Sequence, residues 1–265
     1  MKKKLIGITM AFAMVTSLVA CTGSTEEAAT TETSTEASEA TESKGTLVMA
    51  TNAEFPPYEY HDGADDEIVG IDAEIAAAIA EKLGYTLEIE DIAFDSVIPE
   101  VTSGKADFGM AGMTVTEERK QSVNFSDSYA TAVQVVIVAE DSDITSVDDL
   151  EGKLIGVQSG TTGDLYATDD FGDDNVERYN KGMEAVQALS QGKVDAVIID
   201  NEPAKVFVEE TEGLKILDSA YAEEEYAIAI ALDNTDLLND INAALAELKA
   251  DGTIDAIVSK YITTD

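Results

Sequence analysis

One pattern in this sequence occurs twice, and this repeat limits the folds that the chain can adopt. VTSGKADFGMA, at residues 101–111, and LSQGKVDAVII, at residues 189–199, share a helix end, a Gly-Lys-x-Asp turn and an apolar strand. Each copy is also preceded by a buried strand, at residues 47–50 and at residues 154–157. Each half therefore carries the same βαβ step, which predicts two similar α/β lobes with open, mostly parallel sheets.

Two apolar segments can connect these lobes. Residues 131–139 (TAVQVVIVA) can cross from the first lobe to the second, and residues 226–232 (YAIAIAL) can cross back. Residues 237–261 have the apolar spacing of helices that return to the first lobe. Two crossover strands make a hinge, and closure of hinged lobes encloses a ligand. The predicted division is lobe 1, residues 45–132 and 226–265, and lobe 2, residues 133–225.

The topology also predicts where a ligand would bind. In open parallel sheets, ligands lie beyond the carboxyl ends of the strands. Four segments reach this edge of the two sheets, namely residues 52–55, 111–114, 158–162 and Asp200. We therefore expect the binding site to lie between the lobes, where these segments converge.

Arg119 is the centre of the densest motif, GMAGMTVTEERKQSVNFSDSY, at residues 109–129. Thr116 is expected to cap a helix that places Arg119 at its third position, where the helix dipole disfavours a cation. A carboxylate ligand would stabilise the guanidinium there, and the glycines that open the motif let the backbone approach a ligand. The alternative is an ion pair with Glu118 or another surface acid.

Asp200 directly follows an apolar strand, in the sequence AVIID, and is expected to be buried. Burying a carboxylate is costly unless the group is paired. A ligand ammonium is one candidate partner, and the alternatives are Lys205 or a helix-capping role for Asp200. A guanidinium and a carboxylate that face each other across a cleft suit a zwitterion, which indicates an α-amino acid.

The amino terminus has the pattern of a signal peptide. A basic start, residues 1–4, precedes a short apolar stretch, residues 5–18, that is too short for a confident membrane span. Cys21, the single cysteine, follows Leu-Val-Ala and resembles a bacterial lipobox. We expect residues 1–21 to be a lipoprotein signal peptide and Cys21 to be lipidated and anchored to the cell membrane. The alternative, an ordinary secretory signal, would leave an exposed thiol outside the cell.

Residues 22–44 consist almost wholly of Ser, Thr, Ala and Glu, which predicts a disordered acidic linker. The chain has a net charge of −38, and such a field repels nucleic acid and anionic lipid headgroups. Nucleic acid is therefore excluded as a partner.

Catalytic and metal motifs are missing from the sequence. The one histidine, His61, lies in an acidic loop, and neither G-x-S-x-G nor G-x-x-x-x-G-K-[ST] occurs. The acidic runs at residues 62–67 and 169–174 lack the spacing of an EF-hand. We expect no catalytic residue, no cofactor and no metal. Phe55 and Tyr58 either pack on a ligand or join the core.

From Gly45 to Ile262 the chain resembles the extracytoplasmic solute-binding proteins of family 3, which serve ABC importers of polar amino acids. The pieces that match are TNAEFPPYEY, VGIDAEIAAAIAEKLG, FDSVIPEVTSGKADFGMAGMTVTEERKQSVNFSDSY, IGVQSGTTGDLYA, GKVDAVIIDNEPA and LKADGTIDAIVSKY. The resemblance implies a two-lobe periplasmic-binding-protein-like (type II) fold. It also implies a monomer that captures a free polar L-amino acid outside the cytoplasm and delivers it to ABC permease subunits in the membrane.

The resemblance assigns roles to the residues that match the family's site. Arg119, with the backbone of Thr114 and Thr162, would hold the α-carboxylate of the ligand. Asp200, Gly112 and Thr114 would hold its α-ammonium. The implied ligand-binding residues are Asn52, Glu54, Phe55, Phe94, Asp95, Gly112, Thr114, Arg119, Gln158, Thr161, Thr162 and Asp200.

The resemblance also bears on the ligand's side chain. Phe55 and Phe94 would pack on the ligand, and the positions that read its side chain include Gln158, Ile199 and Asn52. Relatives that take cationic side chains often have an aspartate at position 52, so Asn52 weakens a basic ligand, whereas the acids Glu54 and Asp95 partly restore it. We favour arginine or lysine slightly over a neutral ligand such as glutamine. The alternatives are an amino acid sensor, or a dehydratase-type enzyme on the same fold.

Overall fold

The computed structural model describes residues 43–63 and 66–262 of the 265-residue chain. The predicted signal peptide, Cys21 and nearly all of the predicted acidic linker lie outside the described residues. The described residues form two lobes, each built on one main sheet, together with a small third sheet.

The first lobe is built on a five-stranded sheet. Strand β1 (Thr46–Thr51) is parallel to both of its neighbours, and β14 runs antiparallel in the same sheet. Across the sheet the order is β5 (Thr86–Asp91), β1, β6 (Phe108–Gly109), β14 (Ala229–Ala231) and β7 (Val123–Phe125).

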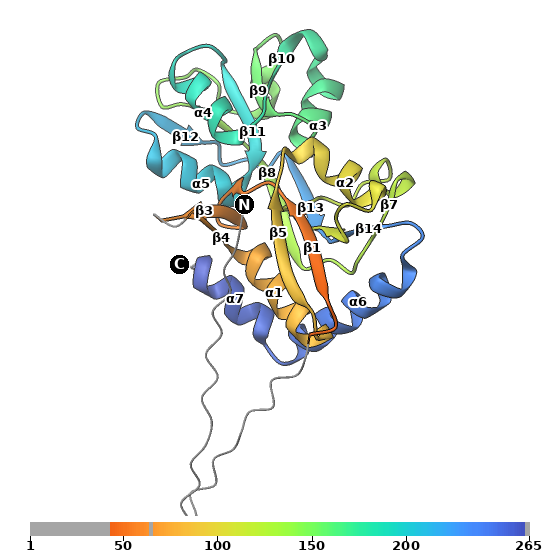
Figure 1. The fold of residues 1–265 in the computed structure, drawn as a ribbon. Coiled ribbons are helices and arrows are strands. Elements are labelled where there is room, and N and C mark those ends of the chain that lie inside the picture. Colours follow the sequence, from red (N-terminus) through yellow and green to blue (C-terminus); the bar gives the residue numbers. More distant parts are fainter. Residues whose placement is uncertain (1–42, 64–65, 263–265) are drawn as a thin grey trace, which may run out of the picture. The chain divides into compact units, whose positions relative to one another are not determined.

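The second lobe repeats this plan in a six-stranded sheet. Parallel strands β10 (Val176–Tyr179), β9 (Ile155–Gln158) and β11 (Ala196–Asp200) lie at one side, and antiparallel strands follow. The antiparallel strands are β8 (Ala130–Ala139), β12 (Leu214–Ile216) and β13 (Ala222–Tyr226). The helices of this lobe are α3 (Thr162–Phe171), α4 (Gly182–Ser190) and α5 (Asn201–Glu210), and α3 and α4 flank β9 and β11 (Figure 1).

The repeated Gly-Lys-x-Asp turn has the same structural role in both lobes. Asp107 accepts a hydrogen bond from the backbone N–H of Val48 at 2.8 Å, and Asp195 accepts one from that of Leu154 at 2.9 Å. In return, the backbone N–H of Asp107 donates to the carbonyl oxygen of Val48, and that of Asp195 donates to the carbonyl oxygen of Leu154. The turn therefore holds the start of β6 against β1 in the first lobe and the start of β11 against β9 in the second.

Helix α1 (Ile71–Leu83) covers the first sheet, as its apolar spacing predicts. Ile71, Ile75 and Ile79 lie on one face and are fully buried. Gly84 ends the helix with a left-handed φ of 81°, and its N–H donates to the carbonyl oxygens of the last turn. Two carboxyl-terminal helices, α6 (Thr235–Ala250) and α7 (Thr253–Tyr261), pack against α1 (Figure 1).

Short elements bring side chains to the edge where the two main sheets meet. A small antiparallel sheet consists of β2 (Glu54–Phe55), β3 (Glu59–Asp62) and β4 (Glu67–Val69). The 3-10 turn η1 (Phe94–Ser96) leads into helix α2 (Val97–Ser103). The remaining 3-10 turns are η2 (Arg119–Gln121), η3 (Val147–Leu150) and η4 (Asp173–Asn175).

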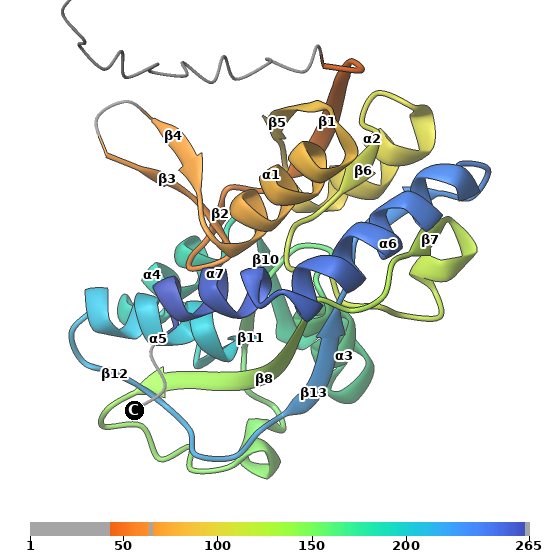
Figure 2. The same cartoon turned by 90° about the horizontal axis from the view of Figure 1, so that it is seen from below.

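The connection between the lobes differs from the sequence prediction in one respect. The first half of β8, residues 130–134, pairs with the whole of β13, and the two strands meet at this end in Figure 2, with Thr131 opposite Glu225 and Ala130 opposite Tyr226. Residues 226–232 were expected to form one crossing strand, but β13 ends at Tyr226 and β14 begins at Ala229 in the other sheet. The break is needed because one straight strand cannot pair within two separate sheets. The lobe boundaries at residues 132/133 and 225/226 stay a prediction.

The structure was also searched for membrane-spanning helices. Within residues 43–63 and 66–262, no helix combines the length and the apolar composition that a bilayer crossing requires.

Candidate functional site

A pocket lies where the strand ends of the two lobes meet. The space between its lining atoms is about 310 Å³, of which only about 20 Å³ can hold the centre of a water molecule. The lobes are therefore close together around it. The pocket is lined by Asn52, Phe55, Glu59, Phe94, Ala111, Gly112, Thr114, Arg119, Gln158, Thr161, Thr162 and Asp200.

Arg119 brings the positive charge to this pocket. Arg119 is 8% exposed, and its Nη1 donates to the carbonyl oxygen of Thr114 at 2.7 Å. Its guanidinium carbon lies 5.3 Å from the centre of the Phe94 ring. Burial lowers the pKa of Arg119, while the negative charges of Glu224 and Asp200 act in the opposite direction. A guanidinium remains protonated in proteins, so a fixed cation faces the pocket.

The local structure around Arg119 corrects the sequence prediction of a helix beginning after Thr116. The chain forms only the three-residue 3-10 turn η2, although the hydroxyl of Thr116 does accept a hydrogen bond from the N–H of Arg119 at 3.1 Å. The turn is brief because the chain must enter β7 at Val123. So short a turn has little dipole, and the guanidinium itself supplies the attraction for an anion.

Asp200 brings the negative charge. The residue is 7% exposed, and its carboxylate accepts hydrogen bonds from the hydroxyl of Tyr226 and, at 2.7 Å, from Nε2 of Gln134. Burial, with a contribution from the nearby Glu224, raises the pKa of Asp200 to about 7, and these two hydrogen bonds oppose the shift. At neutral pH the carboxyl group of Asp200 is therefore only partly ionised, and among the described residues no lysine or arginine forms an ion pair with it.

Neither alternative considered for Asp200 from the sequence applies. Lys205 pairs instead with Glu202, at 2.7 Å. Asp200 occupies the N-cap position of α5, but its side chain makes no capping hydrogen bond.

Gly112 shapes the pocket floor. Its φ of 53° lies in the left-handed region, and its N–H donates to Asp72 at 2.8 Å. A Cβ at this position would lie 2.8 Å from the ring of Phe55. Phe55 therefore packs directly over the glycine and forms one wall of the pocket. Tyr58, in contrast, lies in the core with its ring centre 5.1 Å from that of Tyr226.

Several contacts join the lobes around the pocket, including a hydrogen bond from the hydroxyl of Thr114 to Glu224 at 3.0 Å. Nη2 of Arg119 donates to the carbonyl oxygen of Gly160 at 3.1 Å, and Nε2 of Gln158 donates to Oδ1 of Asn52 at 2.8 Å. At the rim, the ammonium of Lys181 forms an ion pair with Glu54. The structure thus has the two lobes in direct contact across the cleft.

Two of the predicted ligand-binding residues do not line the pocket. Glu54 faces Lys181 at the rim. Asp95 lies beside Gly160, and a Cβ added to Gly160 would be 3.1 Å from the Cβ of Asp95. All the other residues of the predicted ligand-binding set line the pocket, but Ile199, which was expected to contact the side chain of the ligand, does not. Their roles toward a ligand stay predictions.

Glu59 lines the pocket but was missed by the sequence analysis. Ala111, the last residue of the first repeated motif, was predicted only as part of the converging segment 111–114, and it also lines the pocket. Glu59 was overlooked because a single acid in a loop is usually solvated, yet it lies between two tyrosines just after two prolines. It is 1% exposed, and neither of its oxygens accepts a hydrogen bond from an N–H or O–H donor of the described residues.

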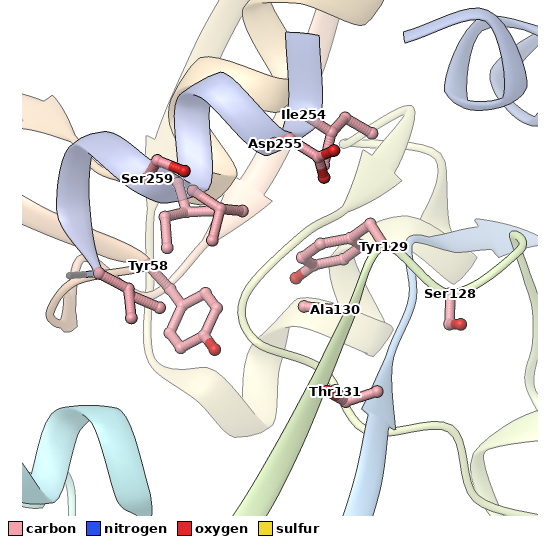
Figure 3. Close-up of a pocket in the computed structure, with 11 residues that line it drawn as sticks. Tyr58, Ser128, Tyr129, Ala130, Thr131, Ile254, Asp255 and Ser259 are labelled. Carbon is pink, nitrogen blue, oxygen red and sulfur yellow. The ribbon is translucent and has the colours of Figure 1, made fainter. Parts of the chain in front are cut away.

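A second, larger hollow lies away from the strand ends, between α7 and the start of β8 (Figure 3). About 680 Å³ of it can hold the centre of a water molecule. Asp255 and Ser259 of α7 contribute to its wall opposite Tyr58 and Tyr129. In the described part of the chain it has no lining residue in common with the cleft pocket, and it contains no lysine or arginine. Of these two hollows in the described part of the chain, the cleft pocket is the one that combines opposite charges.

Among residues 43–63 and 66–262, no group of three or more histidine, cysteine, aspartate or glutamate side chains could hold a metal ion.

Comparisons with known proteins agree with this arrangement. The model of the bacterial extracellular solute-binding proteins, family 3, matches residues 47–264. The arginine-binding extracellular protein ArtP of Bacillus subtilis (strain 168) is 34% identical over 83% of this chain and 87% of its own length. The structure also resembles mixed α/β, type II amino acid-binding proteins.

Two solved structures show the likeness of fold. One is an ancestral arginine-binding protein bound to arginine, with a TM-score of 0.78 and 42% identity over 83% of this chain and 99% of that chain. The other is an ancestral arginine-binding protein bound to glutamine, with a TM-score of 0.79, 42% identity and the same coverage. An arginine-binding protein has thus been solved with a basic and with a neutral amino acid.

Proposed function

This chain belongs to the bacterial extracellular solute-binding proteins, family 3, and we propose that it captures a free polar L-amino acid and delivers it to the permease of an ABC importer. Members of this family bind solutes, so the chain is a binding protein and not an enzyme. The observation that carries the proposal is the pairing of one guanidinium, Arg119, and one carboxylate, Asp200, in the wall of a single enclosed pocket.

The α-carboxylate of the ligand binds to Arg119. One edge of the guanidinium already bonds to Thr114, and its contact with Gly160 involves a neutral carbonyl oxygen that a carboxylate can replace with a stronger, charge-assisted bond. Helix α3 begins at the pocket with Thr161 and Thr162, so the free N–H groups of its first turn favour the same anion.

The α-ammonium of the ligand binds to Asp200. A buried carboxylate that already accepts bonds from Tyr226 and Gln134 is held in one orientation, and an ammonium supplies the ion-pair partner that Asp200 lacks among the described residues. The hydroxyl of Thr114 and the backbone of Gly112 line the pocket and add polar contacts. Phe55 and Phe94 enclose the aliphatic part of the ligand.

A basic amino acid, arginine or lysine, is the preferred ligand in this proposal. The buried carboxyl group of Glu59 supports a cationic side chain, since it lies at the pocket wall and accepts no hydrogen bond from an N–H or O–H donor of the described residues. The amides of Asn52 and Gln158, which bond to each other at 2.8 Å, suit neutral polar side chains as well. The preference is therefore for arginine and lysine, with neutral polar amino acids such as glutamine bound more weakly.

Thermal unfolding in the presence of each of the twenty amino acids tests this function. A ligand that binds only the folded protein raises the melting temperature as its concentration exceeds the dissociation constant. We expect arginine and lysine to give the largest shifts and acidic amino acids to give none. If no amino acid shifts the transition while another class of solute does, the proposal is wrong.

The membrane attachment is a separate part of the proposal. Cys21 follows the sequence Leu-Val-Ala, so lipidation of its thiol would anchor a monomeric protein outside the cytoplasm. Cys21→Ser is expected to release the protein into the medium or periplasm, as measured by cell fractionation, whereas Ser24→Ala leaves it with the membrane. Membrane association of Cys21→Ser equal to that of the unmodified sequence would contradict a lipid anchor.

A further inference from the structure

Two buried carboxyl groups lie next to each other at the pocket wall. Glu59, the first residue of β3, is 1% exposed and lines the pocket, whereas Asp72, in the first turn of α1, is fully buried behind it. Oδ2 of Asp72 accepts hydrogen bonds from the N–H of Gly112 at 2.8 Å and from the hydroxyl of Tyr129 at 2.7 Å. Oδ1 of Asp72 and both oxygens of Glu59 have no N–H or O–H donor in the described part of the chain.

One proton held between the two groups accounts for these unpartnered oxygens. The side chains of Glu59 and Asp72 are within hydrogen-bonding reach of each other, and two carboxyl groups can bond only if one is protonated. Burial, followed by the neighbouring Asp72, raises the pKa of Glu59 well above its usual range. Burial also raises the pKa of Asp72, but the bonds from Gly112, Tyr129 and Glu59 oppose that shift. The proton therefore resides on Glu59, which donates it to Asp72.

The surroundings of the pair keep this proton in place. The groups that interact with the pair from neighbouring elements are the carboxylate of Asp200 and the hydroxyls of Tyr58 and Tyr129. Among the described residues, no lysine or arginine contributes to the pKa shift of either carboxyl group. Below the pKa of the ligand-free pair, a cation that enters the pocket therefore favours a second negative charge there.

We propose that the Glu59–Asp72 pair matches the charge of the pocket to the side chain of the ligand by releasing or keeping one proton. When a guanidinium or ammonium group binds against Glu59, the proton passes to solvent and the new carboxylate pairs with the cation. When a neutral amide binds, Glu59 stays protonated, still donates to Asp72, and accepts from the ligand N–H with its other oxygen. This inference rests on the proposed function, since the ligand is taken to be an amino acid.

The proposal predicts how the two kinds of ligand respond to pH. Pairing with a cation lowers the pKa of Glu59, so affinity for a cationic ligand increases as pH rises toward the pKa of the ligand-free pair. The increase approaches a factor of about ten per pH unit when one proton is released. The affinity for a neutral ligand lacks this pH dependence. The pH dependence that arises from Asp200 is the same for both ligands, so it cancels when their affinities are compared.

Isothermal titration calorimetry in phosphate and in Tris buffer at pH 7 measures the protons released on binding. L-Arginine and L-citrulline are the probes, because citrulline is the neutral analogue of arginine with a urea in place of the guanidinium. We expect arginine to release about one proton per site more than citrulline. In Glu59→Gln the difference should disappear, whereas Glu54→Gln, which removes the acid at the rim, should retain it.

The possible results separate the inference from the proposed function. Equal proton release by both probes in the wild type overturns the inference and leaves amino acid capture intact. Binding of only one of the two probes also overturns it, because the pair would then not adapt to both charges. If no amino acid shifts the melting temperature, both proposals fail. The comparison of proton release by arginine and by citrulline in the wild type tests the inference even if Glu59→Gln does not fold.

Discussion

Nη2 of Arg119 donates to the carbonyl oxygen of Gly160 across the cleft, at 3.1 Å. Arg119 belongs to the first lobe and Gly160 to the loop after β9 in the second, so a single side chain connects the two. Its other terminal nitrogen is fixed by the carbonyl oxygen of Thr114 at 2.7 Å. The guanidinium is thus oriented before any ligand arrives, which lowers the entropy cost of binding a carboxylate.

Arg119→Ala is expected to reduce amino acid affinity by about 2–5 kcal/mol, because the ligand carboxylate would be enclosed without its charge partner. Isothermal titration calorimetry measures the loss, and circular dichroism should show an intact fold. Arg178→Ala is the matched control, since Arg178 pairs with Asp164 and Asp173 away from the pocket. Equal affinities of Arg119→Ala and wild type would rule out the assigned role.

Affinity for a neutral amino acid should decrease as the pH falls below 7. Burial raises the pKa of Asp200 to about 7 in the ligand-free protein, and an ammonium partner would lower it in the complex. Asp200 must therefore lose its proton for binding, so affinity is full above the ligand-free pKa and declines below it by up to about tenfold per pH unit. Titrations of glutamine from pH 5.5 to 8.5 measure this slope.

Asp200→Asn provides the control for that pH dependence. The amide cannot titrate, so the variant should bind weakly, with an affinity that hardly changes over the same pH range. A slope in Asp200→Asn as steep as in the wild type would assign the pH dependence to another group.

Gly112→Ala should lower both stability and affinity. A left-handed φ of 53° costs a residue with a Cβ about 1–2 kcal/mol, and the added carbon would press on the Phe55 ring at 2.8 Å. Gly192→Ala is matched in backbone strain, with a φ of 66°, but its Cβ would meet open space. Chemical denaturation should show both variants destabilised, whereas titration should show at least tenfold weaker binding only for Gly112→Ala. Equal affinities of the two variants would contradict the prediction.

The ion pair between Lys181 and Glu54 should contribute little to affinity. Both groups are partly exposed at the rim, where such pairs are worth less than about 1 kcal/mol and are weakened by salt. A double-mutant cycle with Lys181→Met and Glu54→Gln, measured from ligand dissociation rates, should give a coupling energy in this range that falls between 50 mM and 500 mM salt. A coupling above 2 kcal/mol would mean that the rim pair holds the lobes closed.

The two-lobe plan could be predicted from the sequence because local sequence patterns indicate it. The repeated Gly-Lys-x-Asp turn, with Asp107 in one copy and Asp195 in the other, marks the same strand pairing in each lobe. The apolar face of α1 and the glycine that ends it are equally local. These features depend on residues only a few positions apart.

The predictions that were wrong or incomplete depend on contacts between distant residues. The helix expected at Arg119 shortens to one turn because the chain must enter the first sheet at Val123. Glu59 was overlooked because its burial arises from α1, and its neighbour Asp72 is tied to Gly112, 40 positions away. Spacing along the sequence contains no information about such tertiary contacts.

Tyr226 is the last residue of β13, at the point where the chain leaves one sheet for the other, and its hydroxyl bonds to Asp200. A change at Asp200 made to alter ligand choice will therefore also remove a hydrogen bond at the point where the chain passes from one sheet to the other. An engineer who wants a biosensor with a new specificity from this scaffold would have to optimise selectivity and the connection between the sheets together, since one hydroxyl group links them.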